Sequence, residues 1–222
     1  MKIVKSSVEV LTPINGERIL NHIETIARTC YQSQQSNNNH NLVKSLIRSE
    51  HFAMLEHYNI SVKFVTDRGV SHEIVRHRLA SFAQESTRYC NYSKDKFGNE
   101  ISVIKPTELK EGSFEYIVWQ KQCEAAERTY FKLLDSGVTP ETARSVLPTS
   151  LKTTIVMTAN VREWRHFLNL RAVGTTGKPH PDIKVLADDL LEQFKEQVPI
   201  LFDDIKYRTP VVFDGIKAGE SI

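Results

Sequence analysis

Residues Tyr58–Thr66 alternate cleanly between the two faces of an extended chain. The apolar positions Ile60, Val62 and Phe64 fall on one face, and this period of two predicts a half-buried strand. Three further strands are expected, at Lys2–Leu11, Ile101–Lys105 and Thr153–Ala159. Their spacing along the chain is too irregular for a doubly wound sheet. We therefore predict an α+β fold with a mostly antiparallel sheet and long helices packed against it.

Apolar residues at helical spacing cover much of the remaining chain. The predicted helices span Ile19–Cys30, Leu42–Ile47, Val70–Leu79, Ser113–Asp135, Asn160–Arg171 and Ile183–Phe194, with a further one that begins at Thr139-Pro140 and ends by Pro148. Ser71 is a possible cap for the third helix, and Gly137 would stop the longest one. Ala80–Tyr92 shows no clear period, and the polar stretch Gln32–His40 is predicted to be a surface loop.

The length of 222 residues and the absence of a composition break favour one domain, 1–222. Twenty-nine Lys and Arg against 27 Asp and Glu leave a net charge of +2, which argues against a general nucleic-acid coat. The chain carries no apolar run of membrane-spanning length and no secretory signal, so the cytoplasm is the expected compartment. Three widely spaced cysteines exclude a disulfide framework and a thiolate zinc cluster: Cys30, Cys90 and Cys123. We expect Cys30 and Cys123 to be small core residues on helices.

Two motifs resemble known sites but lack the required spacing. Gly174–Lys178 looks like a phosphate loop, but its glycines are too close and Pro179 stands where Ser or Thr must bind magnesium. His72 and His77 are five residues apart, about 140° around a helix, so they cannot bind one zinc ion from the same face. No dinucleotide-binding glycine motif is present. We expect no metal site.

The segment Arg76–Tyr89 holds three arginines and a histidine within thirteen positions. Arginine suits bidentate contact with phosphate and stacking on flat rings, so the composition fits an anionic ligand with an aromatic head. A solvated basic surface is the alternative interpretation. On a helix, the consecutive residues Arg76, His77 and Arg78 could not share one face, so at least one is expected to point inward or into a partner. A buried arginine would need an anion.

Arg76-His77-Arg78 followed after seven residues by Ser86 resembles the signature of the flavin-dependent thymidylate synthases. Other blocks of the chain are similar to that family in the same order: His51–His57, Ala143–Pro148 and Asn160–Arg171. The resemblance implies a homotetramer with FAD and dUMP at sites shared between subunits. It also implies synthesis of dTMP from dUMP, with methylenetetrahydrofolate as carbon donor and NADPH as reductant of the flavin.

Carried over by position, the resemblance implies two sets of ligand-binding residues. The set for FAD is His51, Glu56, Arg76, His77, Arg78, Gln84, Asn160, Arg162 and His166. The set for dUMP is Glu73, Arg76, Gln84, Glu85, Ser86, Thr87, Arg88, Arg144 and Arg171. Ala53, Ala83 and Gln84 depart from the family pattern and could loosen FAD or change the grip on dUMP. The segment Gly174–Pro181 could be a longer loop, or a lid that brings His180 near the folate.

The same resemblance implies physical roles. Ser86, Arg88 and Arg144 would hold the dUMP phosphate by charge-assisted hydrogen bonds worth roughly 1.5–3 kcal/mol each. Arg171 would be the catalytic residue, placed at the uracil edge to favour ionisation at N3. No cysteine has the setting of a thymidylate synthase nucleophile. A non-catalytic nucleotide-binding regulatory module and an RNA-binding protein are the alternative functions.

Overall fold

The structure is a computed structural model that describes residues 1–207 except 31, 33–38, 90–91 and 94–97. Most of the predicted loop Gln32–His40 and the whole of Cys90 lie outside the described residues.

The centre of the fold is a four-stranded antiparallel sheet with the order β2-β3-β6-β4. Its strands are β2 (Ser7–Val10), β3 (Asn59–Asp67), β6 (Lys152–Asn160) and β4 (Ala80–Gln84). A separate parallel pair joins β1 (Lys2–Val4) to β5 (Ser102–Ile104). The α+β prediction with a mostly antiparallel sheet is therefore confirmed.

Helices account for most of the other described elements. They are α1 (Gly16–Thr29), α2 (Asn41–Arg48), α3 (Arg68–Ile74), α4 (Phe114–Asp135), α5 (Pro140–Ala143), α6 (Val161–Leu168), α7 (Pro181–Gln197) and α8 (Pro199–Phe202). Two 3₁₀ turns, η1 (Phe52–His57) and η3 (Arg144–Val146), and one π-helical turn, η4 (Asn169–Val173), complete the set. Among the described residues, no helix combines the length and apolar character that crossing a membrane requires.

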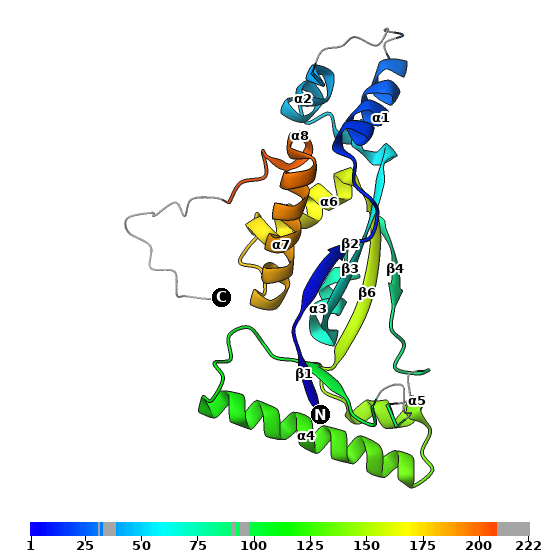
Figure 1. Cartoon of the computed structure of the whole chain (residues 1–222), viewed down its shortest axis with the longest axis vertical. Helices are drawn as coiled ribbons and strands as arrows, with labels where there is room; N and C mark the ends of the chain where they lie inside the picture. The colour runs from blue at the N-terminus through cyan, green and yellow to red at the C-terminus, as the bar shows by residue number, and fades with distance from the viewer. Residues whose placement is uncertain (31, 33–38, 90–91, 94–97, 208–222) are drawn as a thin grey trace.

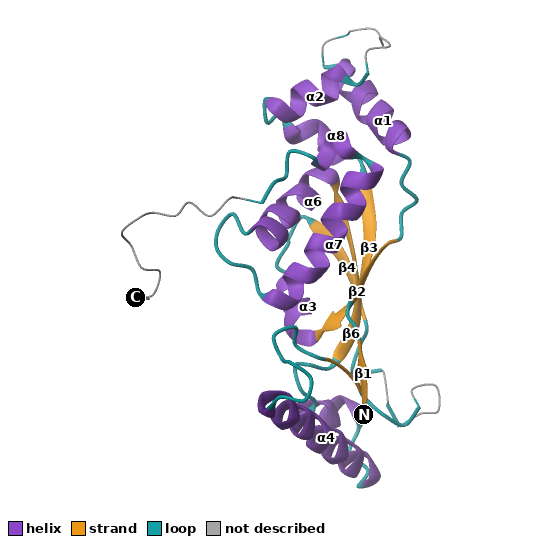
Figure 2. Cartoon of the chain, turned by 60° about the vertical axis from the view of Figure 1, so that its left-hand side comes forward, coloured by secondary structure: helices purple, strands orange, loops and turns teal. Residues whose placement is uncertain are grey.

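The sheet runs along the long axis of the molecule, with α1 and α2 at one end and α4 across the other (Figure 1). Figure 2 shows α3, α6 and α7 on the same side of the sheet. That side receives Phe64 of β3, which meets the rings of Trp164 and Phe167 from α6 at centroid distances of 6.4 and 5.9 Å. The indole of Trp164 also donates to the Ile60 carbonyl at 3.0 Å. The apolar face of β3 thus packs against α6, and these contacts fix the position of α6 along the strand.

Two strand predictions need correction. The expected strand Lys2–Leu11 is two strands, β1 and β2, because the chain leaves the parallel pair before it joins the antiparallel sheet. Ala80–Gln84, in the segment without a clear period, forms β4 along β6. Only Phe82 of β4 is a large apolar residue, so the strand is held by its neighbour rather than marked by its own pattern.

The helix expected at Val70–Leu79 begins and ends earlier. It starts at Arg68 because the Asp67 carboxylate, not Ser71, caps it by accepting the backbone N–H of Val70 at 2.9 Å. It ends at Ile74, so the arginine cluster follows the helix. Cys123 is buried as expected, but Cys30 is exposed at the C-cap of α1, so its prediction as a core residue is wrong.

Candidate functional site

His77 is the buried member of the group Arg76, His77 and Arg78. Its side chain is 3% exposed, whereas both flanking arginines are exposed. The expectation that one of the three points inward is confirmed, although they lie in the connection between α3 and β4 rather than on a helix.

A chain of four side chains passes through His77. Its Nδ1 lies 3.2 Å from Oε1 of Glu163 on α6, and its Nε2 accepts from Nε of Arg171 at 3.3 Å. Nη1 of Arg171 donates to Oε2 of Glu73 at 2.6 Å, and Nη2 lies 3.4 Å from the Glu73 carbonyl. The structure therefore brings α3, α6 and η4 together around one imidazole.

Burial controls the protonation of His77 and Glu163 in this hydrogen-bonded chain of side chains. Burial first, and then the charges of Arg171 and His166, lower the pKa of His77 to about 4. Burial also raises the pKa of the Glu163 carboxyl, an effect that His166 partly offsets. His77 is thus a neutral imidazole at neutral pH that can accept a hydrogen bond from Arg171.

His77, Glu163 and His166 also place one donor atom each within 4.8 Å of the others, a spacing that could suit a metal ion. Both ring nitrogens of His77 already have partners, however, and one of those partners is the cationic guanidinium of Arg171. A metal ion would have to displace one hydrogen bond and approach a positive charge. The arrangement is therefore better suited to a hydrogen-bonded chain than to a metal centre.

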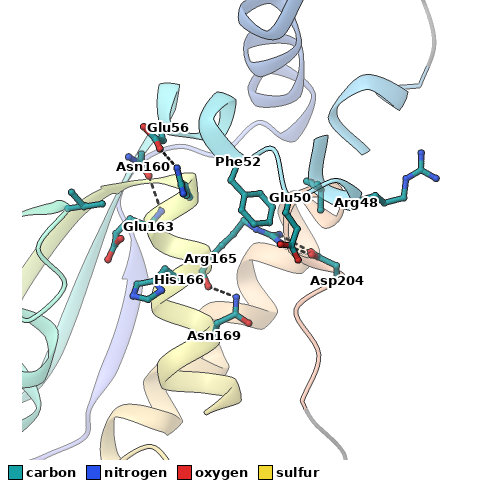
Figure 3. A pocket seen from close by; sticks show the side chains of 13 residues that line it. Arg48, Glu50, Phe52, Glu56, Asn160, Glu163, Arg165, His166, Asn169 and Asp204 are labelled. Atoms are coloured by element: carbon teal, nitrogen blue, oxygen red, sulfur yellow. Dashed lines mark hydrogen bonds and ion pairs between the residues drawn. The ribbon is translucent and has the colours of Figure 1, made fainter. Parts of the chain in front are cut away.

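A pocket of about 930 Å³ opens beside this chain (Figure 3). It collects four residues expected on the flavin: Glu56, Asn160, Arg162 and His166. Nη1 of Arg162 pairs with the Glu56 carboxylate at 2.5 Å, and Asn160 caps α6 by accepting from the N–H of Glu163 at 2.9 Å. The cap explains why this Asn stands at the strand-to-helix junction.

The rest of the pocket wall mixes apolar and charged groups. Ile47, Phe52 and Leu79 supply apolar surface. The charged groups of the wall are the guanidinium groups of Arg48, Arg162 and Arg165 and the carboxylates of Glu50, Glu56, Glu163 and Asp204. The apolar surface suits flat rings and the guanidinium groups suit a diphosphate, and FAD presents both. The pocket residues that would hold it are Glu56 of η1, Asn160 at the β6–α6 junction, and Arg162 and His166 of α6.

The other expected flavin residues do not line this pocket. His51, Arg76 and Arg78 are exposed outside it. Gln84 lies on the helix-covered side of the sheet and donates to Ser71 Oγ at 2.8 Å and Thr153 Oγ1 at 3.2 Å. Ala53 and Ala83, the positions of unusual residues, are exposed. His77 lies behind the pocket and reaches it through Glu163 and His166, which line it.

A second group of predicted residues lies where β4 ends. Nη1 of Arg144 donates to the Thr87 hydroxyl at 3.2 Å, and the Ser86 hydroxyl accepts from the backbone N–H of Arg88 at 3.2 Å. Nε of Arg88 lies 3.1 Å from the Glu141 carboxylate in an exposed pair. Exposed pairs of this kind contribute little to stability, so a phosphate could replace Glu141 at low cost.

Glu85, the next predicted residue of this group, makes structural contacts with β6. Its carboxylate pairs with Nζ of Lys152 at 2.6 Å and accepts from the backbone N–H of Thr154 at 2.9 Å. These contacts join the end of β4 to β6. Glu85 therefore holds the strand end that carries Ser86, Thr87 and Arg88.

The segment Gly174–Pro181 leads from η4 to α7. His180 is the N-cap of α7, and its Nδ1 accepts from the N–H of Asp182 at 3.3 Å. This capping contact favours the loop interpretation of the segment over the lid.

Sequence reasoning missed Glu163, Arg165 and Phe52 as parts of this region. Glu163 stands in the first turn of α6, three residues after its cap, where an acid is ordinary for helix stability. Nη2 of Arg165 lies 2.5 Å from Oδ2 of Asp204. The Cζ atom of Arg165 lies 4.9 Å from the centre of the Phe52 ring. The spacing of Glu163 and His166, one helical turn apart, was the available signal.

Comparison with known proteins gives the family. The model of the family described as thymidylate synthase complementing protein matches residues 17–200. A flavin-dependent thymidylate synthase of Mycolicibacterium gilvum is 30% identical over 89% of this chain and 83% of its own length. One from Geobacter sulfurreducens is 34% identical over 69% of this chain and 64% of its own length.

A solved structure shares the fold. The UMP/dUMP methylase PolB of Streptomyces cacaoi, bound with 5-Br dUMP, superposes with a TM-score of 0.75 at 24% identity, over 91% of this chain and 96% of that one. The sheet and helices of this protein thus form a known architecture. The family match over residues 17–200 and the relative that is 30% identical over 89% of this chain show that the chain belongs to the flavin-dependent thymidylate synthase family.

Proposed function

We propose that this chain is a flavin-dependent thymidylate synthase, which converts dUMP to dTMP. Bound FAD, reduced by NADPH, would supply the hydride, and methylenetetrahydrofolate would supply the carbon. The observation that carries the proposal is Arg171, which His77 and Glu73 hold at the junction of α3, α6 and η4.

Arg171 is the proposed catalytic residue. Its cationic guanidinium can stabilise negative charge that develops on the uracil ring and can favour ionisation at N3. The weakest of its contacts is that of Nη2 with the Glu73 carbonyl, at 3.4 Å. That nitrogen is the one we expect to turn toward the uracil edge. No cysteine nucleophile is required, because the increased charge activates C5 directly.

The phosphate and the flavin would lie on the two groups described above. Ser86, Arg88 and Arg144 would bind the phosphate, with Thr87 positioned by Arg144. Glu56, Asn160, Arg162 and His166 would contact FAD. We also propose that residues 1–222 form one domain and that the protein is a homotetramer with shared sites. We propose the cytoplasm as its location, because that reducing compartment suits the free thiols of Cys30 and Cys123.

Three measurements test the function. The purified protein should absorb visible light as a flavoprotein and should form dTMP from dUMP when NADPH and methylenetetrahydrofolate are present. Tritium should be released from C5-labelled dUMP during turnover. Binding of dUMP without flavin and without tritium release would instead identify a nucleotide-binding regulatory module. Steeply salt-dependent RNA binding would identify an RNA-binding protein.

A further inference from the structure

We infer that Glu163 is a positioning residue that fixes the tautomer of His77 and, through it, the orientation of Arg171. The inference rests on the proposed function for its kinetic consequences, but its structural part stands on the hydrogen-bonded chain alone.

The argument begins with the donors and acceptors. A guanidinium has only N–H donors, so the Nε of Arg171, at 3.3 Å from Nε2 of His77, requires an unprotonated Nε2. The single proton of the neutral imidazole must then be on Nδ1, which faces Oε1 of Glu163 at 3.2 Å. Without an acceptor at that place, the buried Nδ1–H would have no partner, and the opposite tautomer, whose Nε2–H would oppose the N–H of Arg171, would become more populated.

The geometry of α6 supports a dedicated role. Glu163, His166 and Phe167 stand at i, i+3 and i+4, so they share one face of the helix. The rings of Phe167 and His166 lie 4.8 and 5.8 Å from the His77 ring. The imidazole is therefore held in place by two rings, and the Glu163 carboxylate and the Arg171 guanidinium together favour the proton on Nδ1.

Because both side chains are buried, the hydrogen bond between His77 and Glu163 is hard to replace with a hydrogen bond to water. The Glu163 side chain is 7% exposed and that of His77 is 3% exposed, so water is a poor substitute for the carboxylate. Glu163 also lines the pocket expected to hold the flavin. It therefore connects the cofactor side of the site with the residue expected to contact the uracil.

The first test reads the tautomer in the unaltered protein. Magic-angle-spinning NMR of histidine-selectively ¹⁵N-labelled protein should give His77 a protonated Nδ1 and an unprotonated Nε2, with the signal assigned by its loss in His77→Gln. The opposite tautomer, or a doubly protonated ring at pH 7, would overturn the inference. This measurement needs no enzymatic activity, so it is independent of the proposed function.

The second test uses paired variants. Glu163→Gln keeps a carbonyl acceptor of the same shape, so it should keep the tautomer and lose less than about threefold in kcat/KM for dUMP. Glu163→Met removes the acceptor and should lose about tenfold or more in kcat/KM, with the flavin absorbance retained. The exposed Glu192→Met on α7 is the matched control and should leave kcat/KM unchanged.

The outcomes separate the two proposals. A wild-type protein that makes no dTMP contradicts the proposed function, while the NMR result still decides the tautomer. An active Glu163→Met protein with wild-type kcat/KM overturns the positioning role. Loss of flavin from Glu163→Met, or activity that depends on added zinc after chelation, would also overturn it, because Glu163 would then bind the cofactor or a metal ion.

Discussion

At the scale of single residues, the Arg171 guanidinium makes three hydrogen-bond contacts, one with His77 and two with Glu73. The two remaining members of the hydrogen-bonded chain, Glu163 and Glu73, lie at its ends. They accept hydrogen bonds from the buried imidazole of His77 and from the half-buried guanidinium of Arg171. The function of the site therefore depends on hydrogen-bond directions as much as on charge.

Replacement of Arg171 tests this directly. Arg171→Ala should keep its flavin absorbance but lose about a hundredfold in kcat/KM for dUMP, because no fixed charge would face the uracil. Arg171→Lys should not restore the rate, since one ammonium cannot reproduce the planar contacts to His77 and Glu73. The exposed Arg128→Ala serves as the control. Full activity in Arg171→Ala would refute the assigned role.

His77 also makes stability depend on pH. Its pKa is about 4 in the folded protein and near 6.5 when unfolded, so the unfolded state binds the proton first as the pH falls. The free energy of unfolding should therefore decrease between about pH 6.5 and pH 4, by roughly 2 kcal/mol from this group, and should be unaffected by it above pH 7. The raised pKa of Glu163 acts in the opposite direction, since its stabilisation is lost as the pH rises.

Urea unfolding of the wild type and of His77→Gln, at pH 7.5 and pH 4.5, measures this effect. The wild type should lose more stability between the two pH values than the variant does. Equal losses would mean that the folded state accepts the proton on His77 without cost.

At the scale of elements, the α6–η4 segment determines where Arg171 lies. The expected helix Asn160–Arg171 is an α-helix only to Leu168, after which the chain forms the wider π-helical turn η4. Such turns are frequent at functional sites. Gly174 ends the turn with φ of +76°, a conformation that favours glycine.

Gly174→Ala should disturb this turn. Its Cβ would lie 2.7 Å from the Gly177 carbonyl oxygen and 2.9 Å from Cδ of Pro179. We expect a loss of about 2 kcal/mol in the free energy of unfolding and weaker binding of dUMP. Gly112 has a similar φ of +80° and no atom within 4 Å, so Gly112→Ala should cost only about 1 kcal/mol and leave dUMP affinity intact. Equal effects of the two changes would contradict the role of the close contact.

At the scale of the whole molecule, the two groups of predicted substrate residues come from different parts of the fold. Ser86, Arg88 and Arg144 follow β4 and α5, whereas Arg171 lies on η4 beyond α6. The proposed homotetramer with shared sites would allow the two groups at one nucleotide to come from different subunits.

Subunit mixing tests that arrangement. Arg171→Ala and Ser86→Ala proteins should each be nearly inactive alone. When equal amounts are co-produced and assemble at random, about a quarter of the sites would contain both intact groups if they come from different subunits, so about a quarter of the wild-type activity should return. No recovery would place both groups in one subunit. Light scattering should give a mass near four times the 25.4 kDa chain.

The elements with strong local signals could be predicted from the amino-acid sequence alone. The alternation of Ile60, Val62 and Phe64 predicted β3, and the helix-start pattern Thr139-Pro140 predicted the start of α5. The motif around Arg76–Ser86 predicted the family, because its residue types and spacing are specific. These features depend on neighbours along the chain, which a sequence displays directly.

The other features depend on contacts between residues that are far apart in the sequence and meet only in the folded protein. β4 forms because β6 offers a hydrogen-bonding edge, and its own residues carry little strand pattern. In the sequence, Glu163 is an ordinary acidic residue in the first turn of a helix. It contacts His77, 86 positions away, only after α6 packs on the sheet. Which nitrogen of His77 carries a proton, and how far burial lowers its pKa, depend on groups distant in sequence, because desolvation and hydrogen-bond direction arise from packing.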